Sequence, residues 1–102
     1  MINGAGVMAD FTQYGVFTAY REQAYDAAYC RYALLHHLSR WLMRLRCPDD
    51  TMFPVEDLHR AVDEIVLADR EMRAALAQAN EAAALCGKPP LHLHDLTRAR
   101  KG

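Results

Sequence analysis

The sequence has little of what catalytic sites are commonly built from. Serine occurs once, at Ser39, and no glycine-rich loop precedes a helix where it could cradle a phosphate. The three cysteines lack an identifiable histidine and orienting partner that would activate a nucleophile. We therefore expect a protein that is not an enzyme and that uses no cofactor.

Long apolar runs and a charge excess are also missing. No run approaches the roughly 20 apolar residues of a membrane span, and the first residues lack the features of a secretory signal. Twelve basic and 13 acidic residues give a net charge of -1, so no global field favours nucleic acid or a membrane surface. An odd number of widely spaced cysteines does not indicate a disulfide framework. These absences together predict a cytoplasmic protein with free thiols.

What the sequence does contain is helix signals over one domain of 102 residues. No proline interrupts residues 11–47, and Asp10 followed by Gln13 fits a capping box. Pro48 and the aspartates after it then favour a turn. The pattern predicts a first helix at about 10–47.

A second helix is predicted at about 54–86. Pro54 suits a first helical position, and Gly87 suits the left-handed conformation that ends many helices. The prolines that follow Lys88 prevent the helix from continuing, which leaves residues 87–102 as a C-terminal tail.

Both predicted helices carry an apolar seam with heptad spacing and one polar member. The first seam consists of Phe17, Tyr20, Ala24, Ala27, Arg31, Leu34, Leu38, Trp41 and Leu45. The second consists of Leu58, Val62, Ile65, Asp69, Met72, Leu76, Ala79, Ala83 and Cys86. The fold class predicted from these seams is all-α, a long antiparallel two-helix hairpin that resembles a coiled coil.

The two polar members, Arg31 and Asp69, fall one layer apart when the chain folds at the turn. A charge left alone in an apolar seam is costly, so we expect these side chains to pair and to fix the register. The other interpretation is that each reaches solvent at the edge of the seam.

A second apolar stripe on the first helix lies outside the seam and needs cover; it contains Tyr25, Ala28, Tyr32, Leu35 and Leu42. The termini could fold back over it, or two copies could form a four-helix bundle. Because the termini are short, we expect a homodimer.

Four ring-bearing side chains recur at steps of four, three and four, namely Tyr25, Tyr29, Tyr32 and His36. They offer apolar area together with hydrogen-bonding tips, which is typical of protein-binding surfaces. The same stripe would also suit a dimer interface or a surface covered by the N-terminal segment.

The basic residues cluster at two places only. Arg40, Arg44 and Arg46 lie near the end of the first helix, and Arg98 and Arg100 lie in the tail. They could contact phosphates in a small dimeric nucleic-acid-binding regulator, although arginines at a helix C-terminus also stabilise the helix dipole without a ligand.

The tail segment 91–96 alternates leucine with polar residues. His92, His94 and Asp95 would share a face only if this segment were extended, and the spacing matches no specific zinc module. We expect a docking segment anchored by its leucines, and no metal site.

The function favoured by these patterns is a small non-enzymatic protein-binding module, a regulator or inhibitor that acts through its tyrosine-rich surface. The arginine-rich, alanine-rich composition suits a phage or mobile element of a GC-rich host, which would direct the protein at a host complex. The alternatives are the nucleic-acid-binding regulator and a purely structural assembly subunit.

Overall fold

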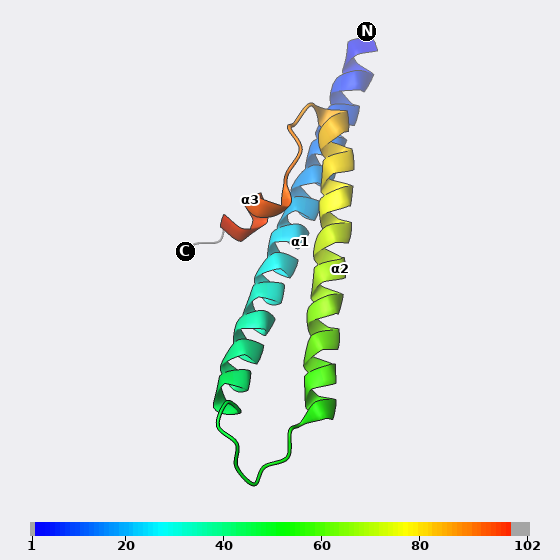
Figure 1. Cartoon of the computed structure of the whole chain (residues 1–102). Coiled ribbons are helices and arrows are strands. Elements are labelled where there is room, and N and C mark those ends of the chain that lie inside the picture. The colour runs from blue at the N-terminus through cyan, green and yellow to red at the C-terminus, as the bar shows by residue number, and fades with distance from the viewer. Residues whose placement is uncertain (1, 99–102) are drawn as a thin grey trace.

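Three helices make up the chain in the computed structural model, which describes the backbone of residues 2–98 and the side chains of residues 12–97. They are α1 (Ile2–Arg44), α2 (Val55–Cys86) and α3 (Leu93–Arg98). Helices α1 and α2 run antiparallel along each other, and α3 folds back against α1 (Figure 1). The predicted all-α hairpin is confirmed.

Helix α1 is displaced relative to the prediction at both ends. It begins at Ile2 rather than near residue 10, so Asp10 lies within the helix and is not its N-cap. It ends at Arg44, and the next turn is closed by the Leu45 amide, which donates to the Leu42 carbonyl at 2.9 Å. A tight turn therefore ends the helix before Pro48 is reached.

The ends of α2 follow the predicted signals closely. Pro54 is the N-cap rather than the first helical residue, and its carbonyl accepts a hydrogen bond from the Leu58 amide at 3.0 Å. Gly87 ends the helix with φ 79° and ψ 19°, a left-handed conformation that costs glycine little. The Gly87 and Lys88 amides both donate to the Ala83 carbonyl, which satisfies an otherwise unpaired group.

The predicted α1 seam is confirmed, because each of its nine residues is buried or partly buried. In α2 the prediction was wrong at Val62, which is exposed. Instead, α2 packs against α1 through buried alanines spaced seven residues apart, namely Ala68, Ala75 and Ala82. Their small side chains allow the two helices to approach closely, and this close packing outweighs the larger apolar side chain of Val62.

The core lies at the end of the hairpin that is remote from the loop. Phe17 packs with Ala79, Ala82 and Ala83 in one cluster of buried residues. A second buried cluster contains Ala24, Ala28, Met72, Ala75 and Leu96. Every fully buried side chain in the described part of the chain lies between residues 17 and 28, between 68 and 83, or at Leu96.

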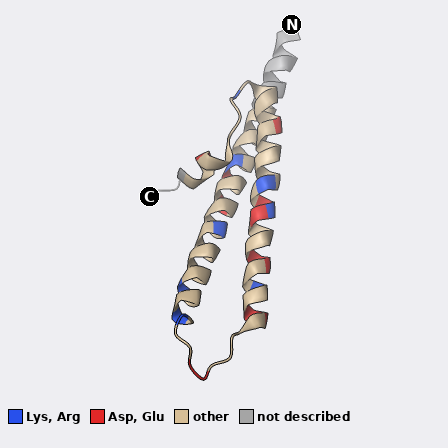
Figure 2. Ribbon diagram, in the orientation of Figure 1, with Lys and Arg blue, Asp and Glu red and all other residues tan. Residues whose placement is uncertain are grey.

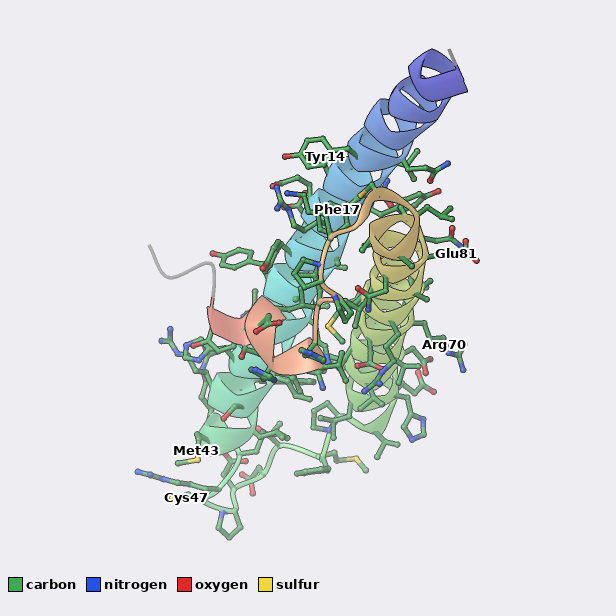
Figure 3. The ribbon with its side chains drawn as sticks, turned by 90° about the horizontal axis from the view of Figure 1, so that it is seen from above. Tyr14, Phe17, Met43, Cys47, Arg70 and Glu81 are labelled. Atoms are coloured by element: carbon green, nitrogen blue, oxygen red, sulfur yellow. The ribbon has the colours of Figure 1, made fainter. Side chains whose placement is uncertain are left out.

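The half of the hairpin near the loop is open by comparison. No described side chain between residues 29 and 67 is fully buried, and the α1 and α2 ribbons are further apart toward the loop in Figure 1. Met43 points away from the hairpin there (Figure 3), and Cys47 is also exposed. The seam residues of this half, such as Leu38 and Ile65, are larger than alanine and hold the helices apart.

The tail docks onto the closed half through α3. The Asn80 side chain donates to the Leu91 carbonyl at 3.0 Å and accepts from the Leu91 amide at 2.7 Å. The His92 amide donates to the Asp95 carboxylate at 2.9 Å, which caps the first turn of α3. Leu96 is buried, as the docking interpretation predicts, whereas Leu93 is exposed. We expected the termini to be too short to cover the second apolar stripe of α1, but the tail covers part of it.

Enlarging one buried alanine should test how closely the helices pack. We expect Ala79→Leu to lower the free energy of unfolding by about 1 to 3 kcal/mol, because Ala79 has no exposed surface and the added carbons have no room. Urea unfolding followed by circular dichroism measures this change. Ala77→Leu, on the exposed face of α2, is the matched control and should be nearly neutral. Equal stability of both variants would contradict close packing at this seam.

Candidate protein-binding site

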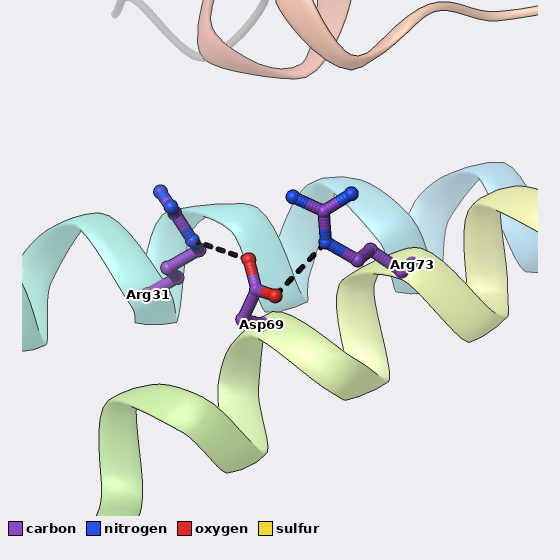
Figure 4. Close-up of polar contacts among 3 residues, drawn as sticks. All are labelled: Arg31, Asp69 and Arg73. Carbon is purple, nitrogen blue, oxygen red and sulfur yellow. Dashed lines mark hydrogen bonds and ion pairs between the residues drawn. The ribbon is translucent and has the colours of Figure 1, made fainter. Parts of the chain in front are cut away.

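One carboxylate on α2 is held between two arginines, one on α1 and one on α2. Arg31 Nε on α1 donates to Asp69 Oδ1 on α2 at 2.8 Å, which confirms the predicted contact. Arg73 Nε donates to the other oxygen, Oδ2, at 2.9 Å from one turn along α2 (Figure 4). Both oxygens of Asp69 therefore accept a charge-assisted hydrogen bond, which is the stronger kind.

This arrangement lowers the pKa of Asp69. The hydrogen bond from Arg73 is the largest cause, partial burial acts in the opposite direction, and the hydrogen bond from Arg31 adds to the lowering. One carboxylate between two guanidinium groups leaves one net positive charge. In Figure 4 the outer nitrogens of both groups point to the side on which α3 lies. That side of the hairpin can thus attract an anionic group.

The four predicted protein-binding residues fall into two environments. Tyr25 is partly buried against the cluster that contains Leu96, because the docked tail lies over this part of the stripe. Tyr29 and Tyr32 are 56% and 64% exposed. His36 is also exposed, and its ring stacks on Tyr32 with 6.1 Å between ring centroids. The structure therefore leaves three of the four available to a partner.

The exposed tyrosines line a pocket of about 340 Å³ where the three helices meet. Its lining residues are Ala28, Tyr29, Arg31, Tyr32, Leu35, Met72, Leu96 and Thr97. Most of the pocket lining is apolar. Arg31 also lines the pocket, and it belongs to the charged group that it forms with Asp69 and Arg73. The contributions of Met72, Leu96 and Thr97 to this pocket were not predicted from the sequence. Only the expected docking of the tail pointed toward Leu96.

Of the five arginines proposed to contact phosphates, the structure describes the side chains of three. Arg40, Arg44 and Arg46 are exposed near the loop, whereas α3 packs near Ala28. Ala28 and Arg40 are twelve residues apart, or about 18 Å along the helix. The side chain of Arg98, and Arg100 as a whole, lie outside the described residues.

Charges of both signs are distributed along the hairpin (Figure 2). The tip of the loop is acidic, with Asp49 and Asp50 beyond the basic end of α1. On α2, Arg70 and Glu81 point away from the hairpin in Figure 3, as expected for a solvated face. Helix α2 carries seven acidic residues against three basic ones.

The described residues offer neither a metal site nor a membrane span. No group of three or more His, Cys, Asp and Glu side chains there could hold a metal ion. None of the described helices is long and apolar enough to cross a membrane. Comparisons with protein-family models, with curated proteins and with solved structures found no match. The interpretation of the site therefore depends on its own geometry and chemistry.

Replacing Asp69 should weaken the hairpin in a pH-dependent way. Because the pKa of Asp69 is lower in the folded chain, its stabilisation is fully present above the unfolded pKa of about 3.9 and is lost as the pH falls through the folded value. We expect Asp69→Asn to unfold at lower urea than the wild type at pH 7 and 5, with the gap closing toward pH 2. Asp63→Asn, at an exposed α2 carboxylate, is the control and should match the wild type at each pH. A gap that stays constant with pH would contradict the ionic role of Asp69.

Proposed function

We propose that this chain is a non-enzymatic protein-binding module that acts as a regulator or inhibitor by docking onto another protein. The observation that carries the proposal is the pocket between the three helices, with Tyr29 and Tyr32 exposed at its rim. Tyrosine combines a large apolar ring with a hydroxyl and holds few rotatable bonds, which suits it to interface centres. A pocket of this kind takes an apolar side chain presented by a partner.

The charged group beside the pocket adds selectivity to this mode of binding. Arg31 lines the pocket and shares the Asp69 carboxylate with Arg73, so the net charge next to the apolar floor is positive. A partner segment with a carboxylate close to an apolar side chain would contact both features. Electrostatic complementarity of this kind favours one partner over others and speeds encounter.

Other parts of the proposal come from the sequence. Its composition supports an origin in a phage or mobile element and a host protein complex as the target, and its cysteine usage supports a cytoplasmic location. The apolar side chains that remain exposed in the half of the hairpin near the loop support a homodimer, in which a second copy would cover them. Binding would then act by occluding or tethering the target, with no chemical step.

Removing the two tyrosine side chains at the rim of the pocket should sharply reduce capture of the target protein. We expect the double change Tyr29→Ala and Tyr32→Ala to retain helicity and to recover at least about tenfold less target, because each interface tyrosine contributes on the order of 1 kcal/mol or more. The measurement is capture by tagged protein from a nuclease-treated host lysate at moderate salt, with mass spectrometry of what is retained.

Tyr14→Ala, which removes a partly exposed tyrosine remote from the pocket, is the matched control and should capture as the wild type does. Equal capture by the double variant would contradict the proposed site. Loss of all binding on nuclease treatment would favour the nucleic-acid-binding regulator, since phosphate contacts dominate such affinities. Recovery of the tagged chain alone would favour the structural subunit.

A further inference from the structure

The loop between α1 and α2 exposes two large apolar side chains. Met52 is 86% exposed and Phe53 is 57% exposed. Asp49 and Asp50 come directly before them, and Asp49 Oδ1 accepts the Thr51 amide at 2.8 Å, which closes a tight turn. The loop thus presents two large apolar side chains next to the acidic tip that Figure 2 shows at one end of the molecule.

The tip of the loop complements the pocket described above. It offers Met52 and Phe53 beside the carboxylates of Asp49 and Asp50, with Arg44 and Arg46 at its base in the hollow that Asp49 and Phe53 also line. The pocket offers an apolar lining beside the positive group of Arg31 and Arg73. The two cannot meet within one chain, because α1 continues as a helix for twelve residues from Tyr32 to Arg44, about 18 Å. Only the loop of another molecule could reach the pocket.

We propose that the pocket is occupied by the loop of a second copy of this chain. The two copies lie antiparallel and are related by a two-fold axis, so each loop enters the pocket of the partner. Both copies therefore contribute the same surface, which contains the pocket and the loop. Phe53 supplies the apolar anchor, and Asp49 and Asp50 face the guanidinium groups of Arg31 and Arg73. Contacts of this kind combine a buried aromatic anchor with charge complementarity.

The same arrangement accounts for the open half of the hairpin. Leu35 and Leu42 follow Ala28 at steps of seven residues, so they lie on the face of α1 that α3 covers further along. In the antiparallel pair, the stretch between pocket and loop of one copy lies against the same stretch of the other. The uncovered side chains of both copies then cover one another, and α3 limits how far the two hairpins overlap.

This pairing regulates the site on which the proposed function rests. Self-docking and target docking use the same pocket, so they exclude each other. The dimer holds the pocket closed, and dissociation opens it. Target binding would therefore depend on protein concentration even without any modification of the chain.

The test measures the dimer dissociation constant of the purified 102-residue chain by analytical ultracentrifugation over a range of concentrations. We expect Phe53→Asp to raise this constant by about tenfold or more while the helical content stays unchanged, because Phe53 lies in the loop. Leu85→Asp, at an equally exposed leucine on α2 remote from the loop, is the matched control and should dimerise as the wild type does. Met52→Asp is a second loop variant that should weaken the dimer in the same direction.

A monomeric wild type would overturn the proposal, and so would equal dimerisation of the Phe53 and Leu85 variants with the wild type. Because this measurement needs no target, its failure leaves the lysate capture through Tyr29 and Tyr32 unaffected. Conversely, a dimer that depends on Phe53 supports self-docking even where no target is captured. The two proposals can therefore fail separately.

Discussion

Close packing of alanines between α1 and α2 is the constraint on which the rest of the structure depends. Ala24 and Ala28 on α1 and Ala75 and Ala79 on α2 are buried in the two core clusters. Small side chains at these positions let the helices approach, and the tail then docks over the same cluster through Leu96. The closed end of the hairpin is therefore a layered core built from all three helices.

The proposed binding surface lies where this closed packing ends. Arg31 and Asp69 pair at the boundary between the alanine-rich half and the open half, and Arg31 also lines the pocket. The tail leaves Tyr29 and Tyr32 exposed at the same place. Register, pocket and positive charge thus coincide in one short section of the hairpin. The larger seam residues beyond it leave apolar surface that a partner can cover.

Sequence reasoning predicted the features that depend on local or pairwise physics. The heptad seams predicted the hairpin, and Gly87 predicted the end of α2. The two polar seam residues predicted the ion pair between Arg31 and Asp69. The rotation of α2 toward Ala68 and its equivalents was missed, because a hydrophobic pattern ranks Val62 above alanine whereas close packing favours the smaller residue. The pocket was missed because it requires residues from three segments whose contact depends on how the tail docks.

The hairpin is closed at one end and open near its loop, and we propose that another molecule covers the open half. Amide hydrogen exchange of α2, measured residue by residue on dilute protein, tests this claim most directly. The account predicts the slowest exchange at residues 68–83 and much faster exchange at residues 55–66, with the second group becoming protected as concentration rises. Uniform protection along the whole of α2 in dilute solution would contradict it.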